Sequence, residues 1–159
     1  LQGERQSRRD RVSDMMYESD SGITFYSEFD IAEFPDPPIV AQWLVNVAKE
    51  ENNPIDSLSY KFVSDDELLA MNRTYLDHDT YTDILTFPYS YDPVQSDICV
   101  SIDRIRDNAS EHQTTVQREL LRVMVHGLLH MCGYNDDSEE NKAEMRRKED
   151  YYLAQIELL

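Results

Sequence analysis

Basic residues are scarce in this chain of 159 residues. It has 15 lysines and arginines against 32 aspartates and glutamates, which gives a formal net charge of −17 at pH 7. Such a surface repels phosphate backbones at long range. The composition therefore excludes a generic nucleic-acid-binding protein, and we expect no DNA partner.

Cysteines and long apolar runs are also few. The two cysteines, Cys99 and Cys132, have no spacing typical of a disulfide framework, and we expect both to be buried as small hydrophobic side chains. No apolar run approaches the roughly 18 residues of a membrane helix, and no leader pattern opens the sequence. We therefore expect a cytoplasmic location and no membrane partner.

The length suits one domain with a single sizeable core. The first twenty or so residues are polar and lack periodicity. We expect residues 1–20 to be a flexible N-terminal tail and residues 21–159 to form a single domain.

Hydrophobic periodicity predicts both strands and helices within this domain. The predicted strands are 23–29, 57–64, 83–87 and 97–102, with a tyrosine-rich loop at 88–94. The predicted helices are 39–52, 66–75, 103–109, 116–131 and 139–158. Interleaved in this order, they indicate an α+β fold, in which helices lie on a small mixed sheet of about four strands.

Capping residues predict where the last two helices begin and end. Thr114 with Gln117 forms a capping box ahead of the long helix, and Gly133 is the stop signal after it. Asp137 or Ser138 caps the final helix.

The long helix carries the residues with the clearest chemical meaning. On a helical wheel its apolar residues fill one arc, and His126 and His130 project from the opposite side, one turn apart. Gly127, between them, costs about 1 kcal/mol relative to alanine in a helix interior. We therefore expect another backbone or a ligand to approach the helix closely there.

The turn after this helix can complete a metal site. Gly133 lets the chain swing Asp136 or Asp137 back towards the two imidazoles. Two nitrogens and one carboxylate oxygen leave a fourth position for water, as in catalytic zinc sites.

The spacing also limits the chemistry. A zinc peptidase of the HExxH type carries a glutamate where this helix has Gly127. Without that proton acceptor, a water activated by the metal or an electrostatic clamp on a substrate oxygen remains. Phosphodiester cleavage is compatible with both.

The segment HGLLHMCGYND, residues 126–136, resembles the signature H-G-x-x-H-x-x-G-Y-x-H of the YbeY family. Two further segments resemble the same family, MNRTYLDHDTYTDILTFPY at 71–89 and SDICVSIDRIRDNA at 96–109. The resemblance covers most of the chain after about residue 20. Members of this family are single-domain, metal-dependent endoribonucleases of bacterial ribosomal RNA maturation.

The resemblance implies a site with one departure from the family pattern. Asp136 stands where the family has its third histidine, so the implied ligands of one Zn²⁺ or other divalent ion are His126, His130 and Asp136. Asp137 is the alternative third ligand. The fold implied is an α+β layer with the metal site on the long helix and the turn after it.

A phosphate-binding arginine is less well defined. The family often has a basic residue directly after the tyrosine of its second block, where this chain has Leu76. Arg73 is then the candidate that faces the phosphate, alongside His126 and His130 as catalytic residues; the alternative is a solvent-facing helix arginine.

Other polar residues have weaker signals. Arg122 could meet a phosphate or pair with Glu119 three residues earlier. Asp83 is more typical of a cap or a backbone hydrogen bond than of catalysis, and we assign no role to His78 and His112.

By resemblance, the expected function is a zinc-dependent, single-strand-specific endoribonuclease in maturation of the 3′ end of small-subunit (16S) ribosomal RNA and in ribosome quality control. The expected partners are ribosomal RNA, small-subunit ribosomal proteins and maturation factors, because basic ribosomal proteins suit an acidic surface. The alternatives are a metallohydrolase of peptides or small esters, and a non-catalytic ribosome assembly factor with a structural metal.

Overall fold

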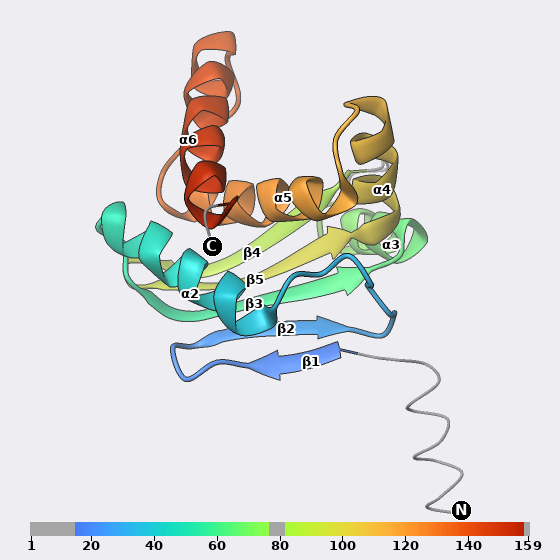
Figure 1. The fold of residues 1–159 in the computed structure, drawn as a ribbon, viewed down its shortest axis with the longest axis horizontal. Helices are drawn as coiled ribbons and strands as arrows, with labels where there is room; N and C mark the ends of the chain where they lie inside the picture. Colours follow the sequence, from blue (N-terminus) through green and yellow to red (C-terminus); the bar gives the residue numbers. More distant parts are fainter. Residues whose placement is uncertain (1–14, 77–81, 158–159) are drawn as a thin grey trace, which may run out of the picture.

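A computed structural model describes residues 15–76 and 82–157, and Figure 1 shows its arrangement. The strands are β1 (Met15–Glu18), β2 (Ile23–Ser27), β3 (Ile55–Val63), β4 (Ile84–Tyr91) and β5 (Val94–Ser101). The helices are α2 (Pro37–Glu50), α3 (Asp65–Leu76), α4 (Ile102–Glu111), α5 (Val116–Met131) and α6 (Glu139–Glu157). In the part of the chain so described, no helix has the length and apolar character needed to cross a membrane.

The five strands form one mixed sheet in the order β1-β2-β3-β5-β4. Strands β2, β3 and β5 are parallel neighbours, while β1 and β4 pair antiparallel at the two edges. The expected α+β class and mixed sheet are confirmed. The sheet has five strands rather than the four predicted.

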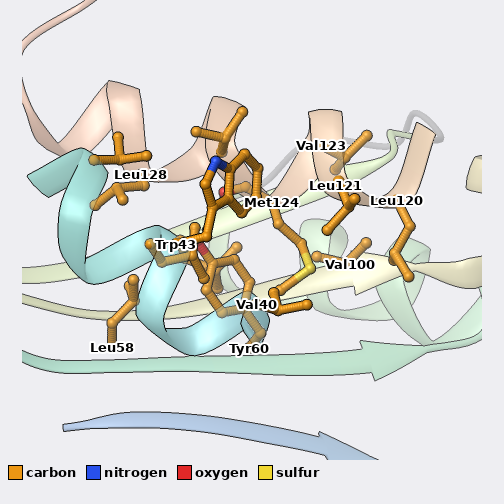
Figure 2. Packing of buried hydrophobic residues seen from close by; sticks show 14 of the residues in the cluster. Val40, Trp43, Leu58, Tyr60, Val100, Leu120, Leu121, Val123, Met124 and Leu128 are labelled. Atoms are coloured by element: carbon orange, nitrogen blue, oxygen red, sulfur yellow. The ribbon is translucent and has the colours of Figure 1, made fainter. Parts of the chain in front are cut away.

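Helices α2 and α5 cover one face of the sheet and bury the main core against it. Figure 2 shows side chains of both helices pointing onto the strands, with Trp43 of α2 beside Met124 of α5. A buried hydrogen bond joins β3 to α5, where the Tyr60 hydroxyl donates to the Met124 carbonyl at 2.7 Å. Another joins α2 to α6, where Trp43 Nε1 donates to the Tyr152 carbonyl at 2.8 Å. The hydroxyl of Tyr60 and the indole N–H of Trp43 are therefore both hydrogen-bonded although the rings are buried.

Helix α3 lies against the opposite face. Its buried Leu68 packs with Val63, Leu85 and Cys99, which point away from α5 because side chains alternate along a strand. Cys99 is buried there, Cys132 is half-buried against the main core, and both are free thiols. Burial raises the pKa of Cys99 to about 11 and that of Cys132 to about 12, as expected for small hydrophobic side chains.

Strand β1 lies within the segment that we predicted to be a tail. Met15 pairs with Ser27 and Glu18 pairs with Thr24 in an antiparallel register. A strand of four residues is too short for a periodic pattern, so its pairing with β2 could not be read from the sequence. The rest of the predicted tail, residues 1–14, lies outside the described residues.

The predicted loop at 88–94 is wrong. Strand β4 continues to Tyr91 and β5 begins at Val94, so the two form a tight hairpin. Proline cannot donate a backbone hydrogen bond, so Pro88 is unfavourable within a sheet. It is accommodated because β4 is an edge strand, and the pairing register shifts between Pro88 and Ser90.

Most of the capping predictions hold, with one shifted by a residue. The N-cap of α5 is Thr115 rather than Thr114, and its hydroxyl accepts from the Arg118 amide at 3.1 Å. At the start of α6, Ser138 accepts from the Asn141 amide at 3.1 Å. Gly133 has a φ of 100°, in the left-handed region, and confirms the predicted stop.

The structure explains the glycine at position 127 differently from the prediction. A Cβ atom at this position would lie 2.8 Å from Ile84 Cδ1 and 3.1 Å from Ile98 Cδ1. The groups that approach are therefore isoleucine side chains of β4 and β5, not a backbone or a ligand. The missing side chain lets α5 lie close to the sheet.

This close packing predicts a specific rescue. Gly127→Ala should lower the free energy of unfolding by about 1–2 kcal/mol, because overpacking outweighs the gain in helix propensity. Adding Ile84→Val removes the nearest methyl group and should recover at least half of that loss, although Ile84→Val alone is destabilising. Urea unfolding of the four proteins measures this coupling, and purely additive effects would contradict the packing explanation.

Candidate metal centre

One of the two predicted histidines, His126, lines a cavity above α5. Figure 1 shows α4 and α6 rising from the two ends of α5, on the side away from the sheet. The cavity has a volume of about 360 Å³ and is lined by these helices and by Asp83, with His126 and Asp136 at its wall.

Three predicted residues converge at this wall. The Nε2 atoms of His126 and His130 are 2.9 Å apart, and each lies 3.5 Å from Oδ2 of Asp136. Asp137, the alternative, bonds elsewhere: its Oδ1 accepts from the Asn141 side chain at 2.7 Å. The structure therefore groups Asp136 with the histidines, although Asp137 follows it directly.

Hydrogen bonds to the other ring nitrogens determine the tautomers. His126 Nδ1 lies 2.7 Å from a carboxylate oxygen of Glu149, and His130 Nδ1 lies 2.9 Å from the Tyr134 carbonyl oxygen. Carboxylate and carbonyl oxygens accept, so both Nδ1 atoms donate. In the neutral rings the two Nε2 lone pairs then face each other, an arrangement that needs a positive charge between them.

The pKa values of the two imidazoles are shifted in opposite directions. Burial lowers the pKa of His126, but the hydrogen bond and charge of Glu149 outweigh it and leave this pKa raised. Burial and the neighbouring His126 lower the pKa of His130. One ring thus takes a proton readily while the other remains neutral.

The donor set fits a divalent metal ion. His126, His130 and Asp136 each offer one ligand atom, and these atoms lie within 4.8 Å of one another. Two imidazoles with one carboxylate form a recognised catalytic zinc set. Among the residues described, no fourth histidine, cysteine or carboxylate joins the group, which leaves a position for water.

Glu149 is a site residue that the sequence prediction missed. It is 5% exposed, and besides His126 it contacts Arg122, whose Nη1 lies 2.9 Å from its Oε1. A carboxylate behind a ligating histidine fixes the ring orientation and increases its basicity. The sequence does contain a sign of its burial, because Glu149 interrupts the apolar stripe of α6 between Met145 and Tyr152.

Arg122 does not pair as predicted. It binds Glu149 and, through Nη2 at 2.7 Å, Asp150, both from α6, rather than Glu119 on its own helix. Its side chain is 15% exposed, so it joins the two helices beside the cavity.

The remaining predicted residues lie in different places. Arg73 is exposed on α3 and is not among the residues that line the cavity, so its catalytic role stays a prediction. Asp83 lines the cavity, and its backbone carbonyl accepts from the Ser101 amide at 2.9 Å; the expected role of its side chain stays a prediction. His78 lies outside the described residues.

A second, half-buried network holds the turn that carries Asp136. Tyr134, whose carbonyl binds His130, donates its hydroxyl to Glu51 at 2.7 Å. Lys148 donates to Glu51 at 3.1 Å, and the Tyr152 hydroxyl donates to it as well. Burial raises the pKa of Glu51, but these donors and the Lys148 charge lower it by more, so that the net pKa lies below its ordinary value of 4.5.

The fold and the site together define a small α+β protein in which two histidines and an aspartate, grouped as a metal ion would need them, lie beside a helix-lined cavity. Comparison with known proteins identifies its family: residues 27–157 match the family model described as "Endoribonuclease YbeY". The chain therefore belongs to the YbeY family, and the resemblance predicted from the sequence is confirmed.

Individual relatives agree with this assignment. The chain is 49% identical to Endoribonuclease YbeY of Cytophaga hutchinsonii, over 72% of this chain and 82% of that protein. It is 39% identical to Endoribonuclease YbeY of Amoebophilus asiaticus, over 84% and 92%. The solution structure of TM1509 from Thermotoga maritima is similar, with a TM-score of 0.58 and 31% identity over 74% of this chain and 78% of that one.

The Glu51 network predicts a pH-dependent contribution to stability. Because the pKa of Glu51 is lowered in the folded state, its contribution is fully present above pH 4.5 and is lost as the pH falls through the folded-state pKa. Glu51→Gln should lower the free energy of unfolding by about 1–3 kcal/mol at pH 7, with the difference shrinking below pH 4.5.

Urea unfolding at a series of pH values measures this effect. Glu50→Gln is the matched control, since it removes the same charge from the neighbouring, exposed position and should change the free energy of unfolding by under about 0.5 kcal/mol. Equal effects of the two substitutions at pH 7 would show that Glu51 does not anchor the turn.

Proposed function

We propose that this chain is a zinc-dependent endoribonuclease that cleaves single-stranded RNA, with one Zn²⁺ ion held by His126, His130 and Asp136. The observation that carries the proposal is the convergence of two Nε2 atoms and a carboxylate oxygen on the wall of an open cavity. The names of the curated relatives, each an endoribonuclease, support RNA as the substrate.

Each residue then has a defined task. Bound zinc supplies Lewis-acid stabilisation of a phosphoryl oxygen and lowers the pKa of a coordinated water. Glu149 and the Tyr134 carbonyl hold the two imidazoles with their Nε2 atoms turned towards each other and towards Asp136. Asp136 offsets part of the charge of the ion, and Gly127 lets α5 lie low enough on the sheet to form the cavity wall.

The alternatives have less support. A peptidase of the HExxH type needs a glutamate where Gly127 packs against two isoleucines, and that position has no room for one. A purely structural zinc ion takes four protein ligands as a rule, whereas three converge in the described part of this chain.

The cellular role belongs to the same proposal. We assign the enzyme to the cytoplasm, to maturation of the 3′ end of 16S ribosomal RNA and to ribosome quality control. The net charge of −17 supports docking through basic small-subunit ribosomal proteins and maturation factors, because free RNA is repelled at long range. Arg73 would contact a phosphate of the strand outside the cavity.

Neighbouring aspartates give a matched test of the metal centre. Asp136→Asn should reduce bound zinc, measured by elemental analysis of the purified protein, and should slow cleavage of a ribosomal RNA fragment by at least roughly tenfold, the lower limit even for residues that only support a ligand. Asp137→Asn removes the same charge one residue later and should retain both zinc and cleavage.

The histidines complete this test. His126→Ala and His130→Ala should lose zinc in the same assay. Full zinc content in Asp136→Asn would remove that residue from the site, and RNA left uncut by the zinc-loaded wild type would refute the proposed activity.

A further inference from the structure

The cavity contains a second buried carboxylate, at Glu119, that the metal centre does not use. Glu119 and Glu149 are both 5% exposed and are the buried acidic residues of the described chain. Glu149 is paired with His126 and Arg122. Glu119 lines the same cavity, and its carboxylate forms no hydrogen bond within the described residues. His112 Nδ1 lies 4.0 Å from Glu119 Oε1, and Arg122 and Arg146 are further basic neighbours.

The carboxylate is available to a ligand that donates hydrogen bonds. A partly desolvated acceptor gains free energy when such a donor bonds to it. The burial also raises the pKa of Glu119. A position in the first turn of α5 suits an acidic residue because of the helix dipole, but that interaction requires no burial. The carboxylate is instead directed into a cavity.

The position of Glu119 relative to the metal centre defines the size of the ligand. Glu119 precedes His126 by seven residues, which places both side chains on the same face of α5, about 10 Å apart along its axis. A phosphate at His126 and a group bound at Glu119 can therefore belong to one nucleotide. Asn108 and His112 lie beside Glu119 on the cavity wall and add polar groups at this end.

Chemical complementarity selects among the bases. An ionised carboxylate has two oxygens that only accept hydrogen bonds. Guanine presents two adjacent N–H donors on its Watson–Crick edge, N1–H and the N2 amino group. Adenine and cytosine place an acceptor beside their amino group, and uracil places its single N–H between two carbonyls. Single-stranded RNA exposes these edges for recognition by side chains.

We propose that Glu119 is the base-recognition residue of the cavity and binds the Watson–Crick edge of a guanine whose phosphate lies at the metal centre. The inference rests on the proposed function, since it takes RNA as the substrate, and it adds a sequence preference to that function. Guanine selectivity then comes from a few contacts inside the cavity, in agreement with an acidic surface that does not attract RNA from a distance.

Cleavage of matched oligonucleotides tests the preference. The substrates are oligouridines of equal length with a single guanosine, adenosine or cytidine at the centre. Zinc-loaded wild type should cleave the guanosine substrate about 5- to 150-fold faster than the others, the range for a bidentate base contact. Glu119→Gln should bring that ratio close to one, because its amide offers one acceptor and one donor.

The control is Glu140→Gln, an exposed position on α6 with the same loss of charge, which should keep the guanosine preference. A structural role of Glu119 would slow all oligonucleotides equally and leave the ratio unchanged. An unchanged ratio in Glu119→Gln, or a wild type without guanosine preference, overturns the inference while the proposed function stands.

A binding measurement decides the inference even if no RNA is cleaved. The four nucleoside 5′-monophosphates are titrated into zinc-loaded protein and followed by NMR. Guanosine monophosphate should bind more tightly than the other three, and Glu119→Gln should remove that difference. Equal binding of all four to the wild type overturns the inference, whereas cleavage without zinc dependence overturns the proposed function alone.

Discussion

Helix α5 packs on the sheet through a position without a side chain, and the geometry of the cavity depends on that contact. Gly127 lies against Ile84 and Ile98, so the height and rotation of the helix are set by the methyl groups of two strands. His126 precedes this contact directly and His130 follows one turn later, which directs both imidazoles away from the sheet. Because packed interiors leave little free space, a shift of α5 would move both imidazoles together.

Charges around the cavity are distributed in two different ways. At the metal centre, the Glu149 carboxylate is shared between His126 and Arg122, so burial of the charge is offset by opposite charge and by hydrogen bonds. Two helix turns away, Glu119 is equally buried, and its basic neighbours Arg122, His112 and Arg146 offset the burial only in part, so its pKa stays raised. The first arrangement stabilises a fixed geometry, whereas the second favours binding of a donor group from outside the protein.

The parts of the fold and site that could be predicted from the sequence are those with local causes. Helix periodicity predicted the observed bounds of α5. The spacing predicted that His126, His130 and one of two aspartates form a group, and the family resemblance selected Asp136, which the structure does bring to the histidines. Glu149 could not be assigned to the site, because its partner His126 lies 23 residues earlier and only the packing of α6 on α5 joins them.

Strand pairing had the same limitation. The partner of β1 is known only once β2 is placed, and Pro88 is compatible with a strand only because β4 lies at the edge of the sheet. The position of Arg73 shows the limit of a local argument in another way. Its position in the second family segment suggests that Arg73 faces the substrate phosphate. Helix α3 instead places it on the surface, outside the cavity.

The hairpin formed by β4 and β5 also affects how copies of this protein behave towards one another. An edge strand with a full row of unpaired backbone groups is a template for strand addition and aggregation. In β4, Pro88 removes one amide donor, and the irregular register between Pro88 and Ser90 bends the strand. The edge of the sheet at β4, the strand that carries Ile84, is thereby a poor template for strand addition by a second molecule.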